Sequence, residues 1–83
     1  MDKTSSVHPN REMFGRAVRI LRLGRRLTQR DLASLSGLRR QHIWEIERGR
    51  ANPSLITIAS VARGLDLRTS ELMAEAEREI GAH

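Results

Sequence analysis

The side chains with the richest hydrogen-bonding chemistry are concentrated between residues 39 and 48. If this stretch is a helix, the apolar residues Leu38, Ile43 and Ile46 share one side of it. The opposite side then carries guanidinium, amide, indole and carboxylate groups, at Arg39, Arg40, Gln41, Trp44, Glu45 and Arg48. Guanidinium and amide groups can make paired hydrogen bonds to the edges of DNA bases. This face is therefore the main candidate for a binding site.

Catalytic chemistry finds little support in the sequence. The three histidines, His8, His42 and His83, are scattered, and the chain has no cysteine. There is no His-Glu-x-x-His motif, no phosphate-binding glycine loop and no Gly-x-Ser-x-Gly sequence. We therefore expect no enzyme activity, no catalytic residue, no metal site and no cofactor.

A second short helix is predicted directly before this face, over residues 28 to 35. Thr28 is a favourable N-cap, and Asp31 suits the positive end of a helix. The apolar side of this helix is formed by Leu32, Ala33 and Leu35. Gly37 can adopt the left-handed conformation that ends a helix. Two short helices joined by a glycine turn, the second with a basic and amide-rich face, predict a helix-turn-helix over residues 28–48.

The rest of the chain favours an all-α domain. Three further helices are expected over about residues 11–25, 55–63 and 70–80, with N-caps at Asn10, Ser54 and Thr69. The second of them is expected to face the core with Leu55, Ile58, Ala59 and Ala62. The polar residues 1–9 are predicted to form a flexible tail, which leaves residues 10–83 as one domain. No segment alternates as a strand does, and no apolar run approaches the ~18 residues that span a bilayer. We expect five helices, no sheet and no membrane span.

Positive charge is concentrated in the amino-terminal part of the chain. The net charge is +5; residues 1–52 hold 12 Lys/Arg against 5 Asp/Glu, whereas residues 53–83 hold 3 against 5. All but one of the cations are arginine, whose planar fork suits phosphate and guanine. This distribution favours a polyanionic partner, although an arginine-rich solvated surface would have the same composition.

An ordered series of short motifs runs from about Ile20 to Met73. It consists of Thr28-Gln29, Leu32-Ala33, Gly37, Ile43, Ile46-Glu47-Arg48-Gly49, Asn52-Pro53-Ser54-Leu55, Ala62, Leu65 and Ser70-Glu71-Leu72. At these spacings the chain resembles the Cro/C1-type (Xre family) helix-turn-helix regulators. The resemblance implies a five-helix, lambda-repressor-like domain whose second paired helix enters the major groove of double-stranded DNA.

By position, the resemblance assigns base reading to the first turns of that recognition helix. Arg40 can grip the O6 and N7 atoms of guanine, Gln41 can pair with adenine, and Glu45 can accept a hydrogen bond from cytosine N4. Each has an alternative. Arg40 and Gln41 can be ordinary solvated groups, and Glu45 can pair with Arg48 or His42 on the helix surface.

The resemblance also implies phosphate contacts on either side of the recognition helix. Gln29 starts the preceding helix, where family members contact a backbone phosphate and where a helix N-terminus favours anions. Cationic and amide groups flank the recognition helix at Arg39, Arg48, Arg50 and Asn52. Phosphate contacts position a protein on DNA without reading its sequence. The alternative for each is an ordinary surface side chain.

Two residues depart from the family pattern. Arg39 stands where Ser or Thr commonly caps the recognition helix, so either the helix begins less well or Arg39 adds a phosphate contact. Trp44 is the only tryptophan and is expected on the exposed side. It can contact a thymine methyl or a sugar, or it can stack with Arg40 or Arg48 by a cation–π interaction.

Two further features follow from the resemblance and the pattern of the last helix. An ion pair is implied between Arg22 and Glu47, which would lock the first helix to the recognition helix. The last helix is a candidate dimer surface through Met73, Ala76 and Ile80, whose alternative is packing on the domain's own core. A dimer would place two recognition helices about 34 Å apart, as a palindrome requires.

The expected function is sequence-specific DNA binding and transcriptional regulation. The lack of a secretory signal and of a membrane span predicts a cytoplasmic protein. By resemblance, it acts as a homodimer on a palindromic operator, as phage repressors and restriction–modification controllers do. The alternative is an antitoxin, which would neutralise a partner toxin and autoregulate its operon. In that case a protein partner would bind in addition to DNA.

Overall fold

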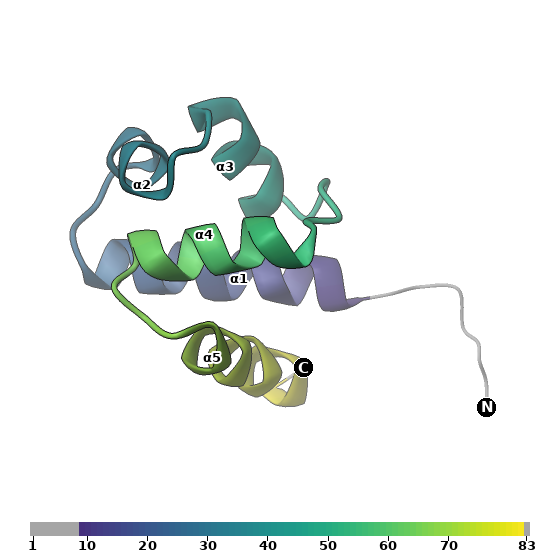
Figure 1. Ribbon diagram of the computed structural model, residues 1–83. Coiled ribbons are helices and arrows are strands. Elements are labelled where there is room, and N and C mark those ends of the chain that lie inside the picture. Colours follow the sequence, from purple (N-terminus) through teal and green to yellow (C-terminus); the bar gives the residue numbers. More distant parts are fainter. Residues whose placement is uncertain (1–8, 83) are drawn as a thin grey trace.

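The computed structural model describes residues 9–82, which form five helices joined by short turns (Figure 1). The helices are α1 (Pro9–Gly24), α2 (Gln29–Ser36), α3 (Arg40–Glu47), α4 (Leu55–Gly64) and α5 (Thr69–Ala82). No strand occurs within this range. The predicted all-α fold with five helices is therefore confirmed. Of the tail predicted over residues 1–9, residues 1–8 lie outside the described part of the chain, and Pro9 belongs to α1.

Two helices have N-terminal ends that differ from the predicted caps. α1 begins at Pro9, so Pro9 belongs to the helix and Asn10 is not its cap. Proline suits the first helical position, because the N–H that it lacks would have no partner there and its φ is already helical. Before α5, the backbone N–H of Arg68 donates to Oε1 of Glu71 at 2.8 Å. Arg68 therefore takes the cap position that we predicted for Thr69.

The core lies where α1 packs between α3 and α5 (Figure 1). α1 packs against α3 and α5, while α4 packs against α2 and α5. Apolar side chains from all five helices meet there, including Val18, Leu32, Ile43, Val61 and Leu72. Leu35 is an exception to the prediction. It is more than half exposed, and the buried side of α2 consists of Leu32, Ala33 and Ser36.

A glycine allows α1 and α3 to approach one another closely. A Cβ atom built on Gly15 would lie 2.2 Å from the backbone oxygen of Ile46 and 2.9 Å from that of Glu47. Neither oxygen can move without disturbing the end of α3. The close crossing at Gly15 thus fixes where the end of α3 lies on α1.

Candidate nucleic-acid interface

α2 begins with a reciprocal pair of capping hydrogen bonds. The hydroxyl of Thr28 accepts from the backbone N–H of Asp31 at 3.0 Å, and the carboxylate of Asp31 accepts from the backbone N–H of Thr28 at 2.9 Å. These bonds favour the charged carboxylate, so they hold the pKa of Asp31 below its ordinary value. The cap predicted at Thr28 is confirmed, and it fixes the N-terminus of α2 where Gln29 lies.

A left-handed glycine turns the chain from α2 into α3. Gly37 has φ 70°, and its N–H points back to the carbonyls of Ala33 and Ser34. The N–H of Leu38 also donates to Ala33, at 2.9 Å. Because these bonds close the end of α2, the chain starts α3 only three residues later. The predicted helix-turn-helix is thereby present in the structure.

The outward side of α3 carries the four base-reading candidates, Arg40, Gln41, Trp44 and Glu45. The first two are exposed and the last two half-buried, whereas Ile43 and Ile46 are buried beneath them. Three of the four, all except Glu45, line a hollow of about 450 Å³ together with Gln29 of α2. The start of α2 and the first turns of α3 therefore share one polar surface.

Glu45 does not form the local ion pair that was the alternative to base reading. It makes no ion pair within the described chain, with either Arg48 or His42. Its backbone oxygen accepts a hydrogen bond from the N–H of Arg50 at 2.9 Å. Its half-buried carboxylate is therefore not neutralised by a neighbouring cation of residues 9–82.

A buried ion pair joins α1 to the end of α3. Nε of Arg22 donates to Oε2 of Glu47 at 2.6 Å, and Nη2 donates to Oε1 at 3.0 Å. The two side chains are only 9% and 3% exposed. Nη1 of Arg22 also donates to the carbonyl of Leu27 at 2.8 Å, which fixes the turn that leads into α2. The pair implied by the family resemblance is present.

Gln29 connects this ion pair to the surface. Its Nε2 donates to Oε1 of Glu47 at 3.1 Å, while the side chain also lines the polar hollow. Sequence reasoning placed Gln29 at a phosphate but missed its bond to Glu47. The family motif gave no signal for that bond, since it depends on how α2 packs against α3. Its second amide hydrogen and its backbone N–H at the start of α2 remain suited to an anion.

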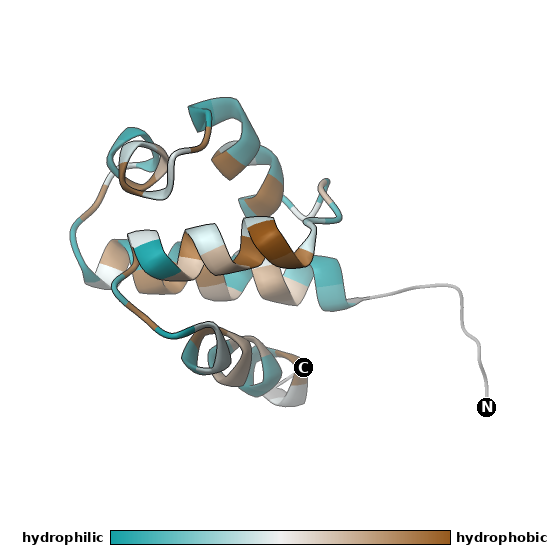
Figure 2. Cartoon of the chain, in the orientation of Figure 1, coloured by the Kyte–Doolittle hydropathy of each residue, from teal (hydrophilic) through white to brown (hydrophobic). Residues whose placement is uncertain are grey.

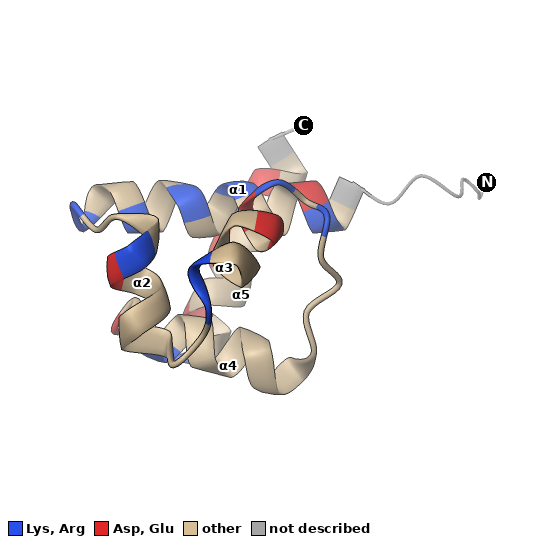
Figure 3. Cartoon of the chain, turned by 90° about the horizontal axis from the view of Figure 1, so that it is seen from above, with Lys and Arg blue, Asp and Glu red and all other residues tan. Residues whose placement is uncertain are grey.

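Cationic residues stand at both ends of α3, as the blue segments of Figure 3 show. Arg39 is its N-cap but makes no side-chain cap hydrogen bond, and it is exposed. Arg48, Arg50 and Asn52 are also exposed, after the helix ends. Arg39 thus takes the cap position without a cap's hydrogen bond. These four of the five predicted phosphate residues therefore flank the recognition helix and are exposed to solvent.

Trp44 is half-buried beneath two arginine side chains. The guanidinium carbon of Arg48 lies 5.3 Å from the centroid of the indole, and that of Arg50 lies 5.6 Å away. Stacking with Arg48 was one of the alternatives considered from the sequence. Stacking with Arg50 was not foreseen, because Arg50 follows the helix and no helical spacing relates it to Trp44.

The apolar residues predicted for a dimer surface separate into two groups. Ala76 is 2% exposed and packs in the core, so its assignment to a dimer surface was wrong. It faces inward because it follows Leu72 by one helical turn. Met73 and Ile80 are partly exposed and line a groove of about 340 Å³ with Phe14, Pro53 and Ile58.

Sequence reasoning missed the most exposed apolar residues of the domain. Leu55 and Ile56 open α4 and are 73% and 80% exposed, although Leu55 was predicted to face the core. They form part of the brown segment at the right-hand end of α4 in Figure 2. The apolar patch, as we call Leu55, Ile56, Met73 and Ile80, thus lies on α4 and α5 rather than on α5 alone.

Other kinds of site have no support in the described residues. No cluster of three His, Cys, Asp or Glu side chains among them could hold a metal ion. None of the helices in residues 9–82 combines the length and the apolar character needed to cross a membrane.

Comparison with known proteins identifies the class to which this geometry belongs. A helix-turn-helix family model matches residues 18–72, which include both paired helices, all of α4, and parts of α1 and α5. The immunity repressor protein of Bacillus phage phi105 is 39% identical over 61 residues, covering 74% of this chain and 42% of the repressor. The chain thus spans about two fifths of that repressor's length.

Two more relatives match over most of their own length. An uncharacterized HTH-type transcriptional regulator, y4dJ, of Sinorhizobium fredii is 35% identical over 63 residues, covering 76% of this chain and 82% of the relative. The crystal structure of the restriction-modification controller protein C.AhdI from Aeromonas hydrophila superposes with a TM-score of 0.76. It is 40% identical and covers 78% of this chain and 98% of its own.

The chain therefore belongs to the Cro/C1-type helix-turn-helix family of DNA-binding transcription regulators. The resemblance stated from the sequence is confirmed. The relatives are named as a repressor, a transcriptional regulator and a controller protein, and none of these names describes an enzyme.

Proposed function

We propose that the protein binds a specific sequence in double-stranded DNA through α3 and regulates transcription there as a homodimer on a palindromic operator. The observation that carries this proposal is the exposed pair Arg40 and Gln41 at the start of α3, on one surface with Gln29. A repressor and a controller protein among the relatives support regulation as the outcome of binding.

Base reading falls to the first turns of α3. The buried Ile43 and Ile46 fix the rotation of the helix, so Arg40 and Gln41 point away from the core into solvent. An exposed helix of this kind fits the major groove, where a guanidinium can bind guanine and an amide can bind adenine. The carboxylate of Glu45 forms no ion pair within residues 9–82 and can accept from cytosine N4.

Phosphate contacts would hold α3 in the groove from both sides. Gln29 lies at the N-terminus of α2, and its amide is held by Glu47. Arg39 precedes α3, while Arg48 and Arg50 follow it. Contacts from both ends of the helix would fix its register on the duplex, which base contacts alone do not ensure.

The apolar patch supports a dimer formed through α4 and α5. Leu55 and Ile56 are exposed side by side, close in the chain to Pro53, which lines the groove with Met73 and Ile80. A two-fold axis near the start of α4 would let the exposed pair of each chain cover the groove of the other. Such an interface is self-complementary, as closed dimers require.

Base reading is tested with Arg40→Ala and Arg48→Ala, titrated against a bound duplex and its single-base variants at several salt concentrations. Arg40→Ala should weaken specific binding by ~1–3 kcal/mol and relax the preference at one base pair. Arg48→Ala should weaken binding to all duplexes equally and make the salt dependence shallower by about one counterion. An unchanged base preference in Arg40→Ala would remove Arg40 from the reading face.

Dimerisation is tested by sedimentation velocity of the full chain with Ile56→Glu and Leu35→Glu. Both side chains are exposed apolar groups on helices, so each variant adds the same charge without entering the core. Ile56→Glu should shift the protein toward monomer, whereas Leu35→Glu on α2 should not. A dimer that persists in Ile56→Glu would place the interface elsewhere.

A further inference from the structure

Two arginine side chains from the turn after the recognition helix lie over the indole ring of Trp44. The guanidinium carbons of Arg48 and Arg50 lie 5.3 and 5.6 Å from the centroid of Trp44. Both distances fall within the range in which a guanidinium is attracted to an aromatic face. The chain has no other tryptophan and no tyrosine, so no other residue type here offers a comparable electron-rich face.

The backbone of the turn brings both arginines to the same ring. The N–H of Arg48 donates to the carbonyl of Trp44 at 3.0 Å, and the N–H of Arg50 donates to the carbonyl of Glu45 at 2.9 Å. Gly49, between them, has φ 72°, which side chains other than glycine rarely adopt. This reversal folds residue 50 back over α3, so that its side chain reaches the ring of Trp44, six residues earlier in the chain.

Electrostatics indicates what this arrangement is suited to bind. The two guanidinium groups carry like charges and are both held beside one ring, so they repel each other. Neither guanidinium forms an ion pair with a carboxylate of residues 9–82, Glu45 included. An anion that contacts both groups would relieve this repulsion. A DNA backbone supplies such anions at regular spacing beside the groove that α3 would occupy.

We propose that Trp44 is a positioning residue, which holds Arg48 and Arg50 in place for the DNA backbone and does not itself read a base. This inference rests on the DNA-binding function proposed above. It changes the assignment of Trp44 from the base-reading set to the support of two phosphate contacts. Arg40 and Gln41, which line the hollow beside the ring, remain the readers of sequence.

The physical reason lies in the flexibility of arginine. A long free side chain loses rotamer freedom when it is fixed on a phosphate, and this loss weakens binding. Stacking on Trp44 already restricts both side chains in the unbound protein. Loss of the ring should therefore weaken binding to every duplex by the same factor, because phosphates are common to all sequences.

The test compares Trp44→Leu and Trp44→Phe with the wild-type chain, by fluorescence anisotropy of a labelled duplex and its single-base variants. Trp44→Leu should lose about 5- to 30-fold in affinity, the equivalent of two exposed cation–π contacts. The loss should be uniform across the duplexes. Trp44→Phe keeps an aromatic face and should retain more of the affinity than Trp44→Leu.

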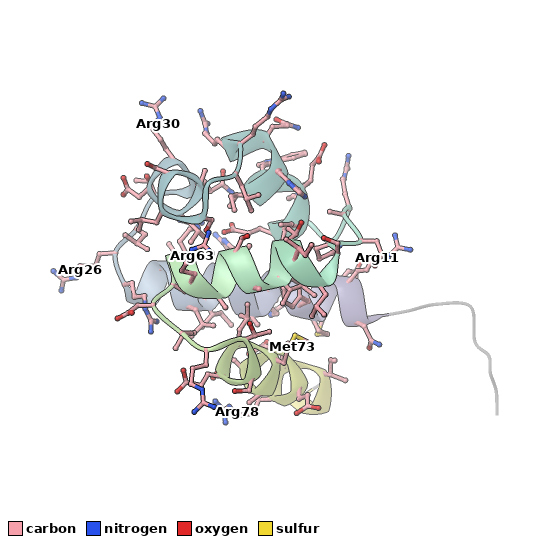
Figure 4. The ribbon with its side chains drawn as sticks, in the orientation of Figure 1. Arg11, Arg26, Arg30, Arg63, Met73 and Arg78 are labelled. Carbon is pink, nitrogen blue, oxygen red and sulfur yellow. The ribbon has the colours of Figure 1, made fainter. Side chains whose placement is uncertain are left out.

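A double-mutant cycle separates positioning from a general loss of packing. Arg50→Gln should weaken binding less in the Trp44→Leu background than in the wild type, because the ring no longer orders that side chain. Arg78→Gln is the matched control for loss of one charge, since Arg78 lies on α5, at the bottom of Figure 4, far from α3. It should leave affinity nearly unchanged in both backgrounds. Thermal unfolding of each variant shows whether it is folded at the assay temperature.

Three results would overturn the inference. A loss confined to one base pair would make Trp44 a base reader, and additive effects of Trp44→Leu and Arg50→Gln would show that the ring does not position Arg50. Unchanged affinity in a folded Trp44→Leu would also exclude the role. If the wild-type chain bound no duplex at all, the proposed function itself would fail, and that result is read from the wild type alone.

Discussion

Replacing Glu47 by glutamine should destabilise the fold far more than an ordinary charge substitution. Its carboxylate accepts two hydrogen bonds from Arg22 and one from Gln29. Glutamine has nearly the same shape but is neutral, and it turns one acceptor oxygen into a donor nitrogen. That nitrogen faces N–H donors, so Arg22 stays buried without a counter-charge.

The expected magnitude follows from the burial of the pair. Removing one partner of a buried ion pair costs ~3–5 kcal/mol. Glutamine retains one acceptor oxygen, so we expect a loss of about 2–3 kcal/mol of unfolding free energy. A domain of this length has about 4–12 kcal/mol in total. The midpoint of thermal unfolding should therefore fall by about 10–20 °C.

Urea unfolding followed by far-ultraviolet circular dichroism measures this loss. Glu79→Gln is the matched control, because Glu79 pairs with the exposed Arg16 at 3.4 Å. The Arg16 side chain is 55% exposed, so we expect this pair to contribute about 0–1 kcal/mol, as surface pairs do. If Glu47→Gln lost no more stability than Glu79→Gln, the ion pair would not lock α1 to α3, and the reasoning would be wrong.

Three further changes are tested by the same unfolding measurement. Thr28→Ala should lower stability by ~1 kcal/mol through loss of the N-cap, and an unchanged value would show that the cap is not needed. Gly15→Ala should cost ~1–3 kcal/mol or more, because its Cβ would meet the oxygen of Ile46; a neutral result would mean that α1 can shift. Folding lowers the pKa of Asp31, so its contribution is complete above its unfolded pKa of about 3.9 and is lost as the pH falls through the lower folded value. Asp31→Asn should therefore lose stability less steeply than wild type below about pH 4, and parallel curves would contradict this.

Local signals in the sequence were sufficient to predict the helix-turn-helix. The capping residues Thr28 and Asp31 act within one turn, and Gly37 satisfies the end of α2 through its own backbone. Such interactions depend on neighbours in the chain and hence appear in the sequence. The Arg22–Glu47 pair spans 25 residues and was predictable only through the family resemblance.

Features that depend on how far one helix covers another could not be predicted. Helical periodicity placed Leu35 and Leu55 on apolar faces, yet neither is covered by another element of the domain. The same periodicity left Ala76 available to a partner, although α5 packs it into the core. The fold-back of Arg50 onto Trp44 requires the left-handed Gly49 and was likewise not visible as a spacing.

Selection from a random pool of duplex DNA, followed by sequencing of what the full chain retains at moderate salt, tests the central claim most directly. We expect enrichment of an inverted repeat with half-sites about one helical turn apart, since two copies of α3 would read them together. Within each half-site, Arg40→Ala should remove the preference at one position. Retention of DNA without any enriched sequence would contradict the account, because it would leave α3 as a basic surface that reads no bases.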